Sequence, residues 1–235
     1  MTRLLIFMIL PVAIAESLFA QSSMRDEPPL ITVHETPAPV PVSNPQQPSE
    51  AQKAENAGVK AFQKGDLEAA RKDFEKLLQL APDNLIGLMN LGAVEYRLKL
   101  YAAAEKHLKR VVRLQPETAA AWLTLGVLYC DQDKLDAALA ALSQAVLLDP
   151  KNPRAHNYLG VTVGRKGWYS GAESELQRAL ELEPDFADAH FNLALFYLQR
   201  DPPAIELARR HYARALELGA PPDPLVEKSL EGSKK

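Results

Sequence analysis

The sequence predicts an all-α fold in which one helical hairpin is repeated along most of the chain. A pattern of small, apolar and proline residues returns every 34 residues between about residues 51 and 220. The composition agrees, because 47% hydrophobic residues, 11 glycines and 7% aromatic residues suit an Ala/Leu-rich helical protein. The 18 prolines gather in one linker and at predicted helix ends, where they do not interrupt a helix.

The first 20 residues predict a secretory signal peptide. Arg3 supplies a positive start, and residues 4–15 form an apolar run that is shorter than the roughly 20 residues needed to span a bilayer. We expect cleavage after Ala20, with Ala15 as the alternative, and an uncleaved anchor is the other interpretation. The protein is therefore expected to be exported to the periplasm or the extracellular space.

Residues 21–48 predict a disordered, partly polyproline-II linker. Proline removes a backbone donor and fixes φ, so neither a helix nor a central strand is expected here. A docking motif for a proline-recognising groove is the alternative. The prolines that carry this prediction are Pro28, Pro29, Pro37, Pro39, Pro41, Pro45 and Pro48.

Residues 119–152 are the clearest copy of the repeat. The first helix carries Trp122, Leu125, Gly126 and Tyr129, and a polar turn over residues 131–134 leads to the second helix. That helix carries Ala138, Leu142 and Ala145, and Pro150 ends it. The folded region 49–220 divides into the copies 51–84, 85–118, 119–152, 153–186 and 187–220.

This spacing resembles the tetratricopeptide repeat (TPR) family. Gly126 and Ala138 are small where the two helices of a hairpin would cross, and Ala145 is small where the next repeat would approach. The resemblance implies a right-handed superhelical α-α solenoid of five TPR-like hairpins. Residues 221–235 are expected to form a capping helix and tail.

The fifth repeat departs from the period, since its second-helix residues Ala208, Tyr212 and Ala215 come two positions late. We expect Asp201 to cap that helix and the two following prolines to occupy its first turn. In the tail, Asp223 is the expected N-cap and Pro224 a first-turn residue. Leu225, Val226 and Leu230 are expected to pack on repeat five.

The sequence favours a binding protein over an enzyme. A net charge of −3 and a pI near 6.0 argue against a nucleic-acid partner. No nucleophile–base signature, phosphate-binding glycine loop or zinc motif is visible, and we expect no cofactor, metal or small-molecule substrate. His156 and His190 share a repeat position and would be stacked neighbours, but Trp122 and Leu88 at the same position indicate packing.

The resemblance further implies that the first helices line a concave groove. Cys130, the single thiol, would lie at its centre, where labelling should be blocked by a bound partner. Asn56, Asn90 and Asn192 share the position at which some relatives hold a peptide backbone. The predicted groove residues are Asn56, Phe62, Met89, Asn90, Tyr96, Arg97, Leu123, Val127, Cys130, Arg154, Asn157, Arg165, Phe191, Asn192 and Gln199.

The function hypothesis is a non-enzymatic scaffold of the cell envelope that binds a peptide segment of a partner protein in this groove. The alternative is a structural self-assembly module or a regulatory subunit of an envelope complex. Contact with a membrane is expected only if the N-terminal segment stays uncleaved.

Overall fold

The computed structural model describes residues 49–231, and every regular element in that range is an α-helix. The predicted signal segment 1–20 and the linker 21–48 lie outside the described residues. No helix within the described range has the length and apolar character that crossing a bilayer requires. In chain order the helices are α2 (Glu50–Gln63), α3 (Leu67–Leu80), α4 (Leu85–Arg97), α5 (Tyr101–Leu114), α6 (Ala119–Asp131), α7 (Leu135–Leu148), α8 (Pro153–Arg165), α9 (Tyr169–Leu182), α10 (Ala187–Gln199), α11 (Ile205–Glu217) and α12 (Pro224–Glu231).

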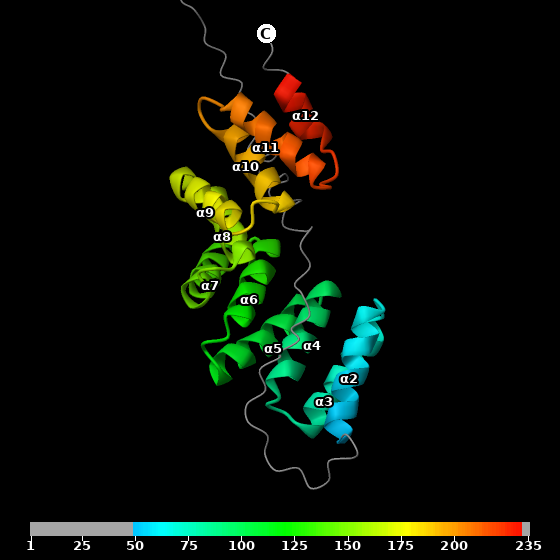
Figure 1. Cartoon of the computed structure of the whole chain (residues 1–235). Helices are drawn as coiled ribbons and strands as arrows, with labels where there is room; N and C mark the ends of the chain where they lie inside the picture. Colours follow the sequence, from blue (N-terminus) through cyan, green and yellow to red (C-terminus); the bar gives the residue numbers. More distant parts are fainter. Residues whose placement is uncertain (1–48, 232–235) are drawn as a thin grey trace, which may run out of the picture.

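Consecutive helices pair into five hairpins that stack from α2–α3 at one end to α10–α11 at the other, where α12 follows (Figure 1). Each first helix from α4 onward packs on its own second helix and on the second helix of the preceding hairpin. The first helices α4, α6, α8 and α10 also contact one another in that order. We call the surface formed by α2, α4, α6, α8 and α10 the first-helix face.

The repeating glycine of the first helices α2, α4, α6 and α8 permits a close approach to the second helix. A Cβ atom at Gly126 would lie 2.5 Å from Cγ of Leu142, which is fully buried. The same clash recurs at Gly58, Gly92 and Gly160, each against a large residue of its own second helix. Ala138 and Ala145 are also buried, which confirms that this pattern of small residues marks the crossing points.

Polar side chains define where several helices begin. The Oγ of Ser49 accepts a hydrogen bond from the backbone N–H of Gln52 at 3.1 Å, so Ser49 is the N-cap of α2. The side chains that cap α3, α4, α8 and α12 in the same way are Asp66, Asn84, Asn152 and Asp223.

The turn of the fifth hairpin differs from the expectation. Helix α11 begins at Ile205, Ala204 is its N-cap residue, and no side chain caps it. Asp201 and the two prolines therefore lie in the preceding loop, because the N–H of Ala204 donates to the carbonyl of Tyr197 at 2.9 Å and closes that loop before the helix starts. The predicted shift itself is confirmed, since the late residues Ala208, Tyr212 and Ala215 are all buried.

Helix α12 covers the end of the stack through Val226 and Leu230, which are buried. The backbone N–H of Asp223 donates to the hydroxyl of Tyr212 on α11 at 2.7 Å, which fixes the approach of the chain to this helix. Leu225 is 41% exposed, so its expected packing on repeat five is wrong. It precedes Val226 directly, and adjacent helical residues point about 100° apart.

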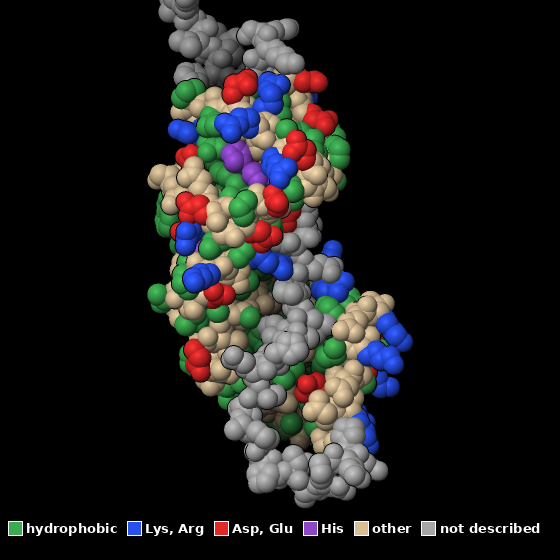
Figure 2. Space-filling model, in the orientation of Figure 1, with side chains coloured by type: hydrophobic (Ala, Val, Ile, Leu, Met, Phe, Trp, Pro, Cys, Tyr) green, Lys and Arg blue, Asp and Glu red, His purple; other side chains and the backbone are tan. Residues whose placement is uncertain are grey.

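The surface of the stack carries charges of both signs. On the face shown in Figure 2, basic and acidic side chains are interspersed over both halves of the molecule. Among the described residues, several charged side chains form ion pairs within a helix, such as Arg71 with Glu75 and Arg178 with Glu181. Exposed pairs of this kind contribute at most about 1 kcal/mol each to folding, so the stack depends mainly on its buried apolar residues.

Candidate functional site

All fifteen predicted groove residues lie on the helices of the first-helix face, α2, α4, α6, α8 and α10. Asn56 is exposed. The half-buried members are Phe62, Arg97, Leu123, Arg154, Arg165 and Gln199. The buried members are Met89, Asn90, Tyr96, Val127, Cys130, Asn157, Phe191 and Asn192.

Several polar members connect one repeat to the next. Tyr96 on α4 donates its hydroxyl hydrogen to Asp131 at the end of α6 at 2.5 Å. Asn192 on α10 donates to the side-chain oxygen of Asn157 on α8 at 2.9 Å. Each pair spans 35 residues, one more than the 34-residue period, so each bond joins a residue to the position one further along in the neighbouring repeat. Burial and the nearby Asp131 carboxylate raise the pKa of the Tyr96 phenol, which keeps it a hydrogen-bond donor.

Arg165 lies at the end of α8 and bridges the same kind of junction. Its guanidinium donates to the carbonyl of Cys130 at 3.1 Å and to the carboxylate of Asp133 at 2.8 Å. Its side chain is therefore mostly covered and already engaged with α6 and the following turn. The expectation that Tyr96, Asn157 and Arg165 are accessible to a partner is wrong, because repeat stacking uses their polar groups.

Cys130 is also covered. Its side chain is 2% exposed, and its Sγ lies 3.0 Å from Oγ1 of Thr162 on α8. Burial raises the pKa of the thiol to about 11, which leaves little reactive thiolate at neutral pH. The expectation that Cys130 is an accessible probe of the groove is therefore wrong.

Asn90 differs from these engaged groups. It lies on α4 at the repeat position that Asn56 holds in α2 and Thr124 in α6, and its side chain is 1% exposed. Within residues 49–231, neither its amide nitrogen nor its amide oxygen has a hydrogen-bond partner. Thr124, which holds this repeat position in the next repeat, does have a partner, since its hydroxyl donates to the carbonyl of Ala120 at 2.8 Å. Asn90 is thus a buried amide whose donor and acceptor are both unused by the described residues.

A cationic and aromatic contact lies near one end of the same face. The guanidinium carbon of Arg97 lies 4.9 Å from the ring centre of Phe62, so α4 and α2 share a cation–π contact. Asn56 accepts a hydrogen bond from the side chain of Gln52 at 3.3 Å. The end of the face formed by α2 and α4 therefore carries polar and aromatic groups together.

The histidines occupy structural positions. His156 and His190 each place Nε2 about 3 Å from the carbonyl of the proline in the preceding turn, and the indole N–H of Trp122 donates to the equivalent proline carbonyl. The Nδ1 of His156 lies 2.6 Å from Glu175, and that of His190 lies 2.9 Å from Nδ1 of His211. The predicted neighbours His156 and His190 therefore engage other residues, and residues 49–231 contain no group of three potential metal ligands.

One set of side chains was not anticipated from the sequence. Lys106, His107, Arg110 and Arg113 on α5 line a cavity outside the first-helix face. The available signal was their clustering within residues 106–113 of the repeat 85–118, in a chain whose net charge is negative.

The fold and this face define a helical-hairpin repeat protein of the solenoid class. Residues 41–210 match the family model described as the tetratricopeptide repeat protein 21 C-terminal ARM domain. The match covers more than half of the chain, so the chain belongs to this family and is a tetratricopeptide repeat protein. None of the curated proteins matches the chain.

Solved structures show the same fold. MamA is 27% identical, with a TM-score of 0.60, and the match covers 68% of this chain and 93% of MamA. TTC0263, a thermophilic TPR protein of Thermus thermophilus, is 25% identical, with a TM-score of 0.60 and coverage of 77% and 97%. YrrB, described as a TPR protein with an unusual peptide-binding site, is 22% identical, with a TM-score of 0.61 and coverage of 79% and 92%.

Proposed function

We propose that this protein is a non-enzymatic scaffold that binds a peptide segment of a partner protein on its first-helix face. The TPR fold supports the general role, because such repeats typically serve protein–protein interaction. YrrB is described as carrying a peptide-binding site, so this fold can hold one. The observation that carries the proposal for this chain is the unused amide of Asn90.

A buried amide without partners costs about 1–3 kcal/mol of stability. A peptide backbone offers a carbonyl oxygen, which could accept from the Asn90 amide nitrogen, and an N–H, which could donate to the Asn90 amide oxygen. These are the two hydrogen-bond partners that the Asn90 side chain lacks. Leu123 on α6 is half-buried and supplies apolar contact area, whereas Met89 on α4 is buried beside Asn90. Because Asn90 is 1% exposed, the peptide would displace the side chains that cover it. The Asn90 amide would then bond to the peptide backbone, and Leu123 would contact the peptide's side chains.

We further propose that the protein acts in the cell envelope. The support is the sequence of the N-terminal segment: Arg3, followed by the apolar run of residues 4–15 and the small residue Ala20. N-terminal sequencing of the protein recovered from an exporting cell tests this proposal. A mature chain that begins at residue 21 supports it, and retention of Met1 on a cytoplasmic protein overturns it.

The substitution Asn90→Ala separates binding from folding. Because the amide has no partner in the described structure, the free energy of unfolding should stay unchanged or rise by about 1 kcal/mol, while peptide capture is lost. Denaturant unfolding measures the first effect. Affinity capture of partners from envelope extracts, followed by calorimetry with the captured peptide, measures the second.

Asn192→Ala is the matched control, since it removes the same side chain from an amide that bonds to Asn157. This control should lower the free energy of unfolding by about 1 kcal/mol or more. Peptide capture by Asn90→Ala at the wild-type affinity would contradict the proposed site.

A further inference from the structure

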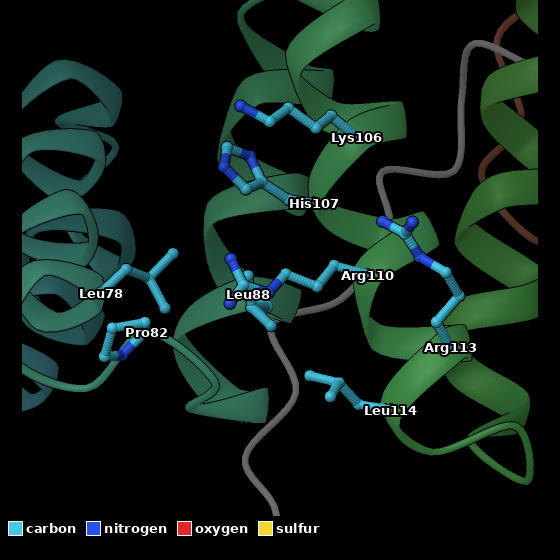
Figure 3. Close-up of a pocket in the computed structure, with 8 residues that line it drawn as sticks. All are labelled: Leu78, Pro82, Leu88, Lys106, His107, Arg110, Arg113 and Leu114. Atoms are coloured by element: carbon cyan, nitrogen blue, oxygen red, sulfur yellow. The ribbon is translucent and has the colours of Figure 1, made fainter.

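A second candidate binding site lies between the second helices of the first two hairpins. Figure 3 shows this cavity, which has a volume of about 430 Å³ and extends between α3 and α5. It shares no residue with the first-helix face candidates. Its apolar surface comes from Leu78 on α3, Pro82 in the following turn, Leu88 on α4 and Leu114 on α5. Leu114 is 47% exposed, so apolar area remains accessible at its edge.

Four basic side chains of α5 line the same cavity, and two of them have local partners. Arg110 donates twice to one oxygen of Asp83, at 2.7 and 3.0 Å. His107 lies 2.7 Å from the buried carboxylate of Glu95. No acidic residue is among the described residues that line the cavity.

Lys106 and Arg113 keep their charges uncompensated. Within residues 49–231 neither forms an ion pair, and Arg113 donates only to the backbone carbonyl of Lys109 at 3.2 Å. Both side chains are exposed. The cavity therefore combines an apolar floor with two cations that remain available to an anionic ligand.

The other repeats show that folding does not require this charge pattern. The place of Lys106 is taken by Ala140 in repeat three and by Ser174 in repeat four. The place of Arg113 is taken by Glu217 in repeat five, where it pairs with Arg214 at 2.9 Å. By contrast, Arg110 and Arg214 occupy equivalent positions and pair with the aspartates of the preceding turns, which is a structural contact. Arg113 is thus the cation specific to repeat two, whereas the place of Lys106 is also basic in repeats one and five, at Lys72 and Arg210.

We propose that this cavity binds an acidic peptide segment of a partner protein that carries an apolar side chain between two carboxylates. The apolar side chain would cover Leu78 and Leu114, and the carboxylates would bond to Lys106 and Arg113. These residues are two helical turns apart, or about 10 Å. An extended polyproline-II segment advances about 9 Å over three residues and returns its side chains to the same side, so carboxylates at i and i+3 match the spacing.

A random peptide display library, selected on the immobilised full chain, tests this specificity. The expected result is enrichment of peptides with Asp or Glu three residues apart and a large apolar residue between them. Binding of a selected peptide should weaken between about 50 mM and about 500 mM NaCl, because salt screens exposed charges. Enrichment of peptides without paired acidic residues would overturn the proposal.

The double substitution Lys106→Glu/Arg113→Glu reverses the two cations without touching the apolar floor. Dissociation constants of the selected peptides should rise by about tenfold or more. The matched control is Lys72→Glu/Lys76→Glu, which makes the same charge change on exposed residues of α3 and should leave the affinity within about twofold. Equal helical circular dichroism in all three proteins ensures that folding is not the cause.

An unchanged affinity in Lys106→Glu/Arg113→Glu would overturn this site. Loss of the same binding in Asn90→Ala would overturn it as well, because the peptide would then occupy the first-helix face. The two proposals therefore fail on different variants.

Discussion

At the scale of single residues, one position repeats a polar contact with different side chains. Trp122, His156 and His190 all direct a ring nitrogen to the proline carbonyl of the preceding turn. Leu88 holds the same position in repeat two and packs in the core without such a nitrogen. The position thus requires a large side chain, and a ring N–H adds a bond to a carbonyl that no helix satisfies.

The imidazole of His211, whose Nδ1 lies 2.9 Å from Nδ1 of His190, gives the protein a pH-dependent contact. Burial, His190 and Arg210 lower the pKa of His211 from 6.5 to about 4. In the unfolded chain His211 binds a proton near pH 6.5, whereas the folded protein does so only near pH 4. Stability from this residue is therefore complete above about pH 6.5 and is lost as the pH falls toward 4.

The substitution His211→Glu should reduce this loss between pH 7 and pH 5, because it recreates the contact of His156 with Glu175 seen one repeat earlier. Thermal unfolding of both proteins over this pH range measures the difference. Parallel decreases of the melting temperature in the two proteins would contradict the assignment to His211.

A second residue-scale prediction concerns Gly126. An added Cβ would lie 2.5 Å from Cγ and 2.6 Å from Cδ2 of the buried Leu142, so Gly126→Ala should destabilise the protein by about 1–3 kcal/mol. Gly171→Ala in α9 is the control, because the nearest atom to its new Cβ is 3.9 Å away. The control should stabilise by about 0.5–1 kcal/mol through helix propensity. Denaturant unfolding should give the two changes opposite signs.

At the scale of elements, the hairpin turns share one backbone requirement. The residue after the first helix's C-cap has a positive φ in four repeats: 77° at Gly65, 60° at Lys99, 57° at Asp133 and 81° at Gly167. A side chain in this left-handed region costs about 1 kcal/mol or more. Lys99 and Asp133 thus strain the turns that glycine relaxes in the other two repeats.

Lys99→Gly should therefore stabilise the protein by about 0.5–1 kcal/mol, since Lys99 is exposed. Lys64→Gly is the matched control. Lys64 precedes the left-handed residue in repeat one and has φ −82°, so glycine there should destabilise by a similar amount. Urea unfolding of the two variants tests the pair, and a destabilised Lys99→Gly would show that the turn is not strained.

The periodic elements could be predicted from the sequence, whereas the irregular ones could not. Gly126 and Leu142 meet because the helix–turn–helix spacing fixes their contact locally, so their types reveal the fold. The loop before α11 does not follow the repeat spacing, because it is closed by one backbone hydrogen bond from Ala204 to Tyr197. The start of α11 therefore could not be inferred from the preference of proline for a first helical turn.

At the scale of the whole molecule, the sequence predicted which helices carry the candidate residues. It did not predict which of these residues are exposed. Sequence positions put all fifteen residues on the first-helix face. The bond from Asn192 to Asn157 depends on how adjacent repeats are rotated, and a repeat pattern does not encode that angle residue by residue. The unused amide of Asn90, which singles it out among the asparagines, likewise requires the three-dimensional structure.

The stacked arrangement of the hairpins also leads to a prediction for the C-terminal end of the array. Each repeat contacts mainly its neighbours, so the loss of a terminal cap should act locally and weaken with distance along the array. Val226 is fully buried at the junction of α12 with repeat five. Placing a charge there by Val226→Asp should cost at least the roughly 1.5–3 kcal/mol that burial of such a side chain contributes.

Hydrogen exchange of the full chain measures where this loss falls. Amide protection in α10 and α11 should decrease in Val226→Asp, while protection in α2 and α3 stays at the wild-type level. Leu225→Asp is the control, because Leu225 is 41% exposed and its substitution should leave both ends unchanged. If α10 and α11 kept full protection in Val226→Asp, α12 would not stabilise the array. A uniform loss from α2 to α11 would instead show that the five hairpins unfold as one cooperative unit.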